Sequence, residues 1–207
     1  MQSLSLEYNQ TMTKLKTQSA GNTLSTRERI LLCARQITME QGATNLTIDS
    51  VAERSGLSKG GVLYHFPSKK ALMSAMIQQY ADLLESRLQQ GMRRHKEAFD
   101  PLLPGYASWF TSFSKNDQGS RSWGSSMFAV HSFDPKLLEP LAAWYQQLAE
   151  RVRSSPVQFE DAAIIILALE GLFYLKLFDL DALTSEEHQR IICRLLEMAH
   201  PADVGQH

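Results

Sequence analysis

Apolar residues recur every three or four positions along most of this chain, and that spacing predicts helices. The first clear pattern begins at Ser25, which has capping-box spacing with Glu28, and Gly42 ends it. A longer pattern follows Pro67, where Ser68 is placed to cap another helix. The predicted apolar stripe of that helix consists of Leu72, Met76, Tyr80 and Leu83.

The second half of the chain is also predicted to be helical. Its character changes near residue 91, and Asp100-Pro101 and Pro104-Gly105 are expected to break the helical pattern. Later helix starts are predicted at Asp134-Pro135, at Ser155 to Gln158, and at Thr184 with Glu187. No stretch alternates as a strand would, so the predicted fold class is all-α with about nine helices.

Residues 46–71, LTIDSVAERSGLSKGGVLYHFPSKKA, read as a helix-turn-helix of about residues 46–65 followed by the start of a third helix. Thr47 precedes a short apolar helix, and Gly56 can adopt the positive φ that a tight turn needs. Ser58 then caps a second short helix, whose inward residues are Val62 and Phe66. Its outward residues are Lys59, Gly60, Gly61, Tyr64 and His65. A small, basic, hydrogen-bonding face of this kind fits a DNA major groove.

The adjacent glycines Gly60 and Gly61 cost the short helix roughly 1 kcal/mol each relative to alanine. That cost is understandable if the helix backbone must approach DNA closely. Sequence readout would then rest on Lys59, Tyr64 and the shape of the DNA. The alternative is that the glycines are needed for packing against a neighbouring helix.

Charge divides the 207-residue chain in two, although its net charge is only -1. Residues 1–80 carry an excess of +4, whereas residues 81–207 carry an excess of -5. Nucleic acid is therefore expected at the N-terminal part. The predicted organisation is a mobile tail over 1–24, a DNA-binding domain over 25–80, and a helical domain over 81–207.

Residues 25–80 resemble the DNA-binding domain of the TetR family of bacterial transcriptional regulators. The shared motifs are T-x-x-x-[IV]-A at Thr47 to Ala52, S-G-[LV]-S-[KR]-G at Ser55 to Gly60, and H-F-x-x-K-x-x-L at His65 to Leu72. One departure is Leu63, which stands where many members have the first of two consecutive aromatic residues.

The motif assigns DNA contacts to individual residues. Thr47 lies at a helix N-terminus, which is a ready phosphate site, and Lys59 can reach a guanine edge or a phosphate. By resemblance, Lys69 contacts a phosphate at the start of the next helix. Tyr64 and His65 are expected to hold the DNA backbone. The complete predicted DNA-binding set is Thr47, Ser58, Lys59, Gly60, Gly61, Tyr64, His65 and Lys69.

Aromatic residues cluster in the middle of the chain, where the resemblance places a small-molecule effector. The predicted effector-binding residues are Trp109, Phe113, Trp123, Phe128, Trp144, Glu170 and Phe173. An aromatic-lined cavity suits a planar or hydrophobic ligand. Ordinary core packing is the alternative for the aromatic residues. Glu170 is an acid among apolar neighbours, so it either faces a cationic effector, pairs with a basic residue, or lies at a dimer seam.

The resemblance also implies a homodimer formed by the last two long helices as a four-helix bundle. Residues 161–178 are apolar around most of the helix circumference, so two sides of that helix need cover. The predicted interface residues are Ile165, Leu169, Leu172, Ile192, Leu195 and Leu196. The alternative is that both helices fill a monomeric core.

The predicted function is a homodimeric repressor that a small molecule releases from double-stranded operator DNA. The alternative is a constitutive DNA-binding or architectural module without an effector. No nucleophile–base pair, metal-ligand spacing or phosphate loop suggests an enzyme, a metal or a cofactor. Two scattered cysteines, Cys33 and Cys193, and no membrane-spanning apolar run fit a reduced, cytoplasmic protein.

Overall fold

The computed structural model describes residues 24–116 and 134–199, with the side chains of 110–116 left undescribed. The described part contains eight α-helices and two short 3₁₀-helices, and no strand. The predicted all-α class is therefore confirmed. The predicted tail over 1–24 lies outside the described residues except for Leu24. The elements are α2 (Thr26–Gln41), η1 (Ala43–Asn45), α3 (Ile48–Ser55), α4 (Lys59–His65), α5 (Lys69–Arg94), α6 (Leu102–Asn116), η2 (Pro135–Leu138), α8 (Glu139–Arg153), α9 (Phe159–Leu177) and α10 (Ser185–Met198).

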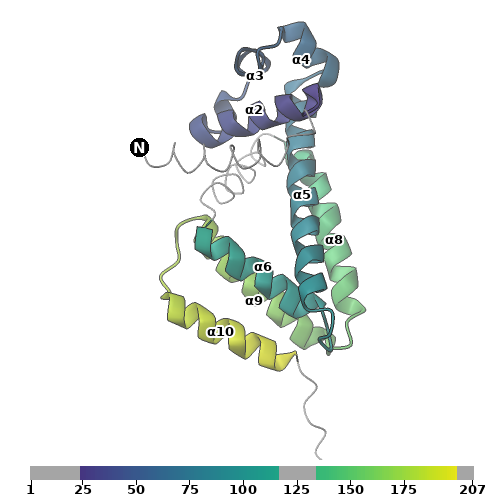
Figure 1. The fold of residues 1–207 in the computed structure, drawn as a ribbon, viewed down its shortest axis with the longest axis vertical. Coiled ribbons are helices and arrows are strands. Elements are labelled where there is room, and N and C mark those ends of the chain that lie inside the picture. Colours follow the sequence, from purple (N-terminus) through teal and green to yellow (C-terminus); the bar gives the residue numbers. More distant parts are fainter. Residues whose placement is uncertain (1–23, 117–133, 200–207) are drawn as a thin grey trace, which may run out of the picture.

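Helices α2, α3 and α4 form a small head at one end of the molecule (Figure 1). The predicted start signals are confirmed here: Ser25 and Glu28 form a complete capping box, and Ser58 accepts from the N–H of Gly61 at 3.1 Å. Gly56 closes α3 in the left-handed conformation with φ of 67°. These local signals set the angle between α3 and α4. Val62 and Phe66 are then buried on the inner side of the head.

Helix α5 leaves the head and runs the length of the rest of the molecule (Figure 1). Ser68 caps it as predicted by accepting from the N–H of Ala71 at 3.1 Å. Its buried stripe continues through Leu84 rather than the predicted Leu83, which is half-buried. The predicted domain boundary after residue 80 falls inside this helix. One continuous helix therefore joins the head to the remaining described elements, which we call the body: α6, η2, α8, α9 and α10.

Helices α5 and α6 cross with their backbones almost in contact. A Cβ on Gly91 would lie 2.2 Å from the carbonyl oxygen of Gly105, and a Cβ on Gly105 would lie 2.7 Å from the backbone nitrogen of Met92. The expected helix break at Pro104-Gly105 is wrong, because both residues lie within α6. Proline is tolerated in a first helical turn, and Gly105 is required by the crossing.

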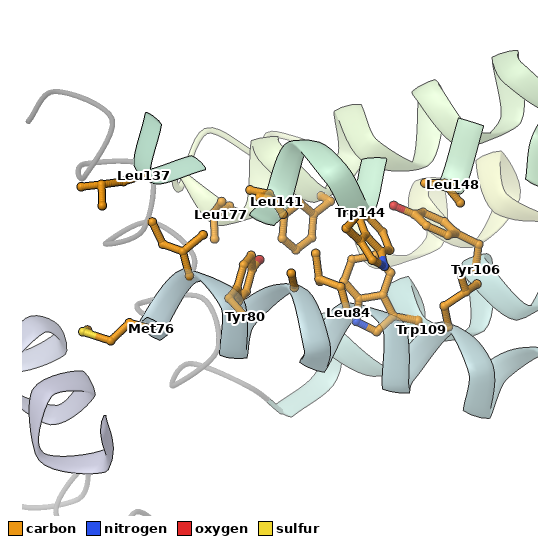
Figure 2. Packing of buried hydrophobic residues seen from close by; sticks show 14 of the residues in the cluster. Met76, Tyr80, Leu84, Tyr106, Trp109, Leu137, Leu141, Trp144, Leu148 and Leu177 are labelled. Atoms are coloured by element: carbon orange, nitrogen blue, oxygen red, sulfur yellow. The ribbon is translucent and has the colours of Figure 1, made fainter. Parts of the chain in front are cut away.

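The body core is built from α5, α6, α8 and α9, with large apolar and aromatic side chains interleaved between them (Figure 2). A second contact between α5 and α8 is polar. Arg151 donates to both oxygens of Glu85 at 2.8 and 2.9 Å, and the indole N–H of Trp144 donates to the same carboxylate at 3.1 Å. The Arg151 hydrogen bonds keep the pKa of Glu85 below its ordinary value.

Two later helix starts differ in detail from the prediction. Asp134 caps a 3₁₀ turn with Pro135 at its first position, and α8 itself begins at Glu139. The predicted start at Ser155 is wrong, because α9 begins at Phe159 after Gln158. The Ser155 hydroxyl instead donates to Asp100 and accepts from the N–H of Val157, which orders the loop before α9.

The last helix, α10, begins with the predicted capping box between Thr184 and Glu187. It packs mainly against α9, with some contact to α6 (Figure 1). None of the helices in the described part of the chain is long and apolar enough to cross a membrane.

Candidate functional site

The outer side of α4 is open to solvent. The Tyr64 side chain is 85% exposed, Lys59 and Gly60 are exposed, and Gly61 is partly exposed. The Tyr64 and His65 rings meet edge to face with centroids 5.2 Å apart. The helix thus buries Val62 and presents its small, basic and hydrogen-bonding residues outward.

Gly60 and Gly61 are not required by internal packing. The nearest group to a Cβ built on Gly60 is the Ser58 hydroxyl, at 3.9 Å. On Gly61 the nearest atoms would be that hydroxyl at 3.4 Å and the Leu57 Cβ at 3.7 Å. These are contacts within the same turn and helix, so packing against a neighbouring helix is excluded as their explanation.

Two lysines of the predicted interface are held in place before any DNA is bound. The Lys59 ammonium pairs with Asp49 at the start of α3, at 3.0 Å. The Lys69 ammonium donates to the backbone oxygen of Thr44 at 3.4 Å. Both contacts are exposed, so both lysines can exchange them for phosphate or base contacts at little cost.

Thr47 and Ser58 have a capping role that the structure makes explicit. The Thr47 hydroxyl accepts from the N–H of Ser50 at 3.0 Å, and the Thr47 N–H donates to the Ser50 hydroxyl at 3.0 Å. Each of these capping residues is exposed at the N-terminus of its helix. Their direct contact with DNA remains a prediction, but their role in fixing α3 and α4 is established by these bonds.

The geometry of this head is that of a helix-turn-helix protein, and similarity to known proteins identifies its family. Residues 30–76 match the family model "Bacterial regulatory proteins, tetR family", and residues 104–200 match "Tetracyclin repressor-like, C-terminal domain". The chain belongs to the TetR family of DNA-binding transcriptional regulators. Its relatives are regulators rather than enzymes.

Curated relatives support the same assignment over shorter stretches. The transcriptional activator FasR of Mycolicibacterium smegmatis is 30% identical over 104 residues, which cover 49% of this chain and 48% of FasR. The regulator RutR of Escherichia coli is 34% identical over 80 residues, covering 38% of this chain and 36% of RutR. These two matches therefore span about half or less of the length of FasR and of RutR.

Solved structures share the fold over most of the chain. A transcriptional regulator from Streptomyces coelicolor A3(2) superposes with a TM-score of 0.68 at 17% identity, covering 82% of this chain and 97% of that one. The multidrug binding protein EbrR, complexed with malachite green, gives a TM-score of 0.66 at 20% identity, with coverages of 82% and 96%.

The six aromatic residues of the predicted effector site fall into two groups. Trp109, Trp144 and Phe173 are buried in the body core, where the Trp109 and Phe173 ring centroids are 5.5 Å apart. The Phe113 side chain, Trp123 and Phe128 lie outside the described residues. A hollow of about 420 Å³ lies elsewhere, beside α10, and contains none of the predicted effector residues. It is lined by Leu183, Glu187, Arg190, Ile191, Arg194 and Leu195.

Glu170 has partners that the sequence did not suggest. Its carboxylate accepts from the hydroxyl of Tyr106 on α6 and, at 3.0 Å, from the hydroxyl of Tyr145 on α8. The Tyr145 and Tyr174 hydroxyls are hydrogen-bonded at 3.1 Å. No basic side chain in the described ranges forms an ion pair with Glu170, so the expected pairing with a basic residue stays a prediction. Burial raises the pKa of the Glu170 carboxyl, and the two tyrosine hydroxyls oppose that rise.

The residues predicted for a dimer interface lie mostly inside the protomer. Five of them are buried in its own core, and Leu196 is half-buried; the five are Ile165, Leu169, Leu172, Ile192 and Leu195. A side chain with almost no exposed surface has little to offer a partner subunit. Apart from Phe159 at its first position, the large apolar residues that α9 leaves exposed are Ile164, Leu167, Leu175 and, just beyond its end, Phe178. Their spacing of three, eight and three residues places them on one stripe.

Proposed function

We propose that this regulator is a homodimeric repressor that leaves its operator when a small molecule enters the body. The observation that carries this proposal is the continuity of α5. This single helix starts at Lys69, beside the DNA face, and ends against α6 at the Gly91–Gly105 crossing. Because the helix is continuous, a rearrangement of the body helices shifts the head as well.

The body also reaches the head end of α5 through an ion pair. The Lys70 ammonium lies 2.5 Å from the carboxylate of Asp134, the residue that caps η2. Asp134 raises the pKa of Lys70, and Lys70 lowers that of Asp134. Since Lys70 is the neighbour of the predicted phosphate contact Lys69, this pair supports coupling between body and DNA face.

Homodimer formation is supported by the exposed apolar stripe on α9. Leu167 is 69% exposed and Ile164 is 50% exposed, and a Cβ on Gly171 between them and Leu175 would meet nothing within 4 Å. An apolar stripe open to this degree is typical of a subunit interface. We expect Leu167→Lys to give a monomer in analytical ultracentrifugation, whereas Phe99→Lys, at another exposed apolar residue, leaves the dimer intact. An undisturbed dimer in Leu167→Lys would place the interface elsewhere.

Effector release is tested by measuring operator affinity with and without ligand. The fold neighbour EbrR has been solved in complex with malachite green, ethidium and imidazole, which supports a ligand-responsive body here. A bound effector must weaken DNA binding by the same factor by which DNA weakens effector binding. If every compound that binds the body leaves the affinity for a selected DNA duplex unchanged, the constitutive DNA-binding module is the correct function.

Activation is the second candidate function, and it rests on one relative. FasR is named a transcriptional activator and aligns with 104 residues of this chain. A reporter gene placed behind the selected operator separates the two modes. A repressor lowers reporter expression when the protein is supplied, and an activator raises it.

A further inference from the structure

The body contains a buried carboxyl group, that of Glu170, which forms no ion pair with a basic side chain among the described residues. Glu170 is 7% exposed, and its carboxylate is satisfied by two neutral tyrosine hydroxyls. An ionised carboxylate is costly to bury unless a cation compensates it. An apolar residue would fill the same core position at a lower cost, so the position requires an explanation that packing does not give.

The surroundings of Glu170 are aromatic on several sides. The centroid of the Trp109 ring lies 5.2 Å from that of Tyr106 and 5.5 Å from that of Phe173. The ring centroids of Phe173 and Tyr174 are 5.5 Å apart. Figure 2 shows Tyr80, Tyr106, Trp109 and Trp144 among the buried side chains that pack between α5, α6, α8 and α9. Aromatic faces attract cations, and the attraction is strongest where water is excluded. A carboxylate combined with such faces is a chemical environment suited to an organic cation.

The two carboxylate oxygens differ in access. Tyr106, which donates to one of them, is 1% exposed, so that side is closed. Tyr145 donates to the other oxygen, and both Tyr145 and its partner Tyr174 are half-buried. The side of Glu170 that faces Tyr145 is therefore the less deeply buried of the two.

We propose that Glu170 is the charge-selecting residue of an effector site for hydrophobic organic cations, and that the cation displaces the Tyr145 hydroxyl from its carboxylate. This inference rests on the proposed effector-released function and adds the chemical class of the effector. Tyr106 and Tyr174 then act as positioning residues, since Tyr106 holds the carboxylate and Tyr174 accompanies Tyr145.

The test uses two probes of similar shape with the full-length protein. Tetraphenylphosphonium carries a permanent positive charge, and triphenylphosphine oxide carries none. Isothermal titration should show that Glu170→Gln weakens tetraphenylphosphonium binding by about tenfold or more and changes triphenylphosphine oxide binding much less. Equal losses for both probes, or no binding of tetraphenylphosphonium to the wild type, would overturn the proposal.

Tyr145→Phe provides a second variant that acts in the opposite direction. It keeps the ring and removes the hydroxyl that competes with the cation, so tetraphenylphosphonium should bind about threefold more tightly. A merely structural role of the cluster predicts weaker binding in both variants. That result, with circular dichroism confirming that both variants are folded, would contradict the proposal.

The pH dependence gives a third readout. Burial raises the pKa of Glu170, so its carboxyl becomes neutral at a higher pH than an ordinary glutamate does. Cation affinity should decrease as this carboxyl loses its charge. The neighbouring hydroxyls of Tyr80, Tyr106, Tyr145 and Tyr174 have pKa values raised above the ordinary value and stay neutral between about pH 5 and pH 8. The wild type should therefore lose affinity on acidification, and Glu170→Gln should not. A flat wild-type profile would contradict the role of the carboxylate.

Operator affinity measured in the same samples separates this inference from the proposed function. If tetraphenylphosphonium releases DNA equally from the wild type and from Glu170→Gln, effector release stands and the carboxylate site is wrong. If it binds through Glu170 and leaves DNA affinity unchanged, the site stands and effector release is wrong.

Discussion

Two pairs of glycines in this chain have opposite surroundings. Gly60 and Gly61 lie on the outer side of α4, where an added Cβ meets no backbone closer than ordinary contact distance. Gly91 and Gly105 lie where α5 crosses α6, and an added Cβ there overlaps the backbone of the other helix. Beside the first pair the space is open at the surface, whereas beside the second pair it is filled by the backbone of the other helix. The contrast separates glycines that the packing of the fold requires from glycines that it does not require.

The largest effect is expected on stability, from a substitution where α5 crosses α6. Gly105→Ala places a methyl group 2.7 Å from the backbone nitrogen of Met92, so α5 and α6 must separate. Overpacking of this kind costs about 3 kcal/mol in the free energy of unfolding, because backbone atoms cannot move aside as a flexible side chain can. Chemical denaturation followed by circular dichroism measures the loss. An unchanged midpoint would mean that the helices do not cross this closely.

The matched substitution on α4 should act on binding instead. Gly60→Ala meets only the Ser58 hydroxyl, at 3.9 Å, so the protein should become more stable by up to about 1 kcal/mol through helix propensity. DNA affinity should fall by about tenfold, because the methyl group occupies the gap between the helix backbone and the duplex. Fluorescence anisotropy with a selected duplex checks the affinity. Retained affinity would show that α4 does not approach DNA through this face.

A smaller effect is expected for Lys69. Lys69→Ala should reduce the slope of log affinity against log salt concentration by about one, because one phosphate contact and its counterion are lost. Lys96→Ala, beyond the far end of α5 and paired with Glu97, is the control and should leave the slope unchanged. Identical slopes for all three proteins would remove Lys69 from the interface.

The smallest effect is expected at Asp49. This residue holds Lys59 at 3.0 Å in the DNA-free protein, and that contact must be exchanged when Lys59 reaches DNA. Asp49→Asn should therefore raise DNA affinity about two- to threefold, as expected for losing a competing exposed ion pair. Asp82→Asn, on the exposed side of α5, is the control. Weaker binding in Asp49→Asn would indicate that Asp49 orients Lys59 for DNA.

The structure of the head was predictable because the capping and turn residues that define it act over only a few positions in the sequence. Ser25, Thr47, Ser58 and Ser68 each cap a helix within three residues, and Gly56 adopts the conformation that its position in the motif indicated. The exposed side of α4 followed from the same spacing. Capping and turn geometry depend on neighbours in sequence, so the order of residues is sufficient to predict them.

The body was less predictable because α9 is apolar on nearly every side. Periodicity could not show which side faces the core, and the predicted interface residues proved to be the inward ones, such as Ile165 and Leu169. The same ambiguity hid the partners of Glu170. Tyr106 and Tyr145 lie 64 and 25 residues away in the chain and meet the carboxylate only after three helices have packed.

The order of residues was enough to predict that this protein is helical, where most of its helices start, and that its N-terminal part carries a DNA-binding motif of the TetR family. Those properties arise from hydrogen bonds and apolar spacings within one helix or one turn. The exposed side of α9, the glycines at which helices touch, and the surroundings of Glu170 became clear only from the packed fold. Each of those depends on how distant helices pack, and no local pattern in the chain encodes that arrangement.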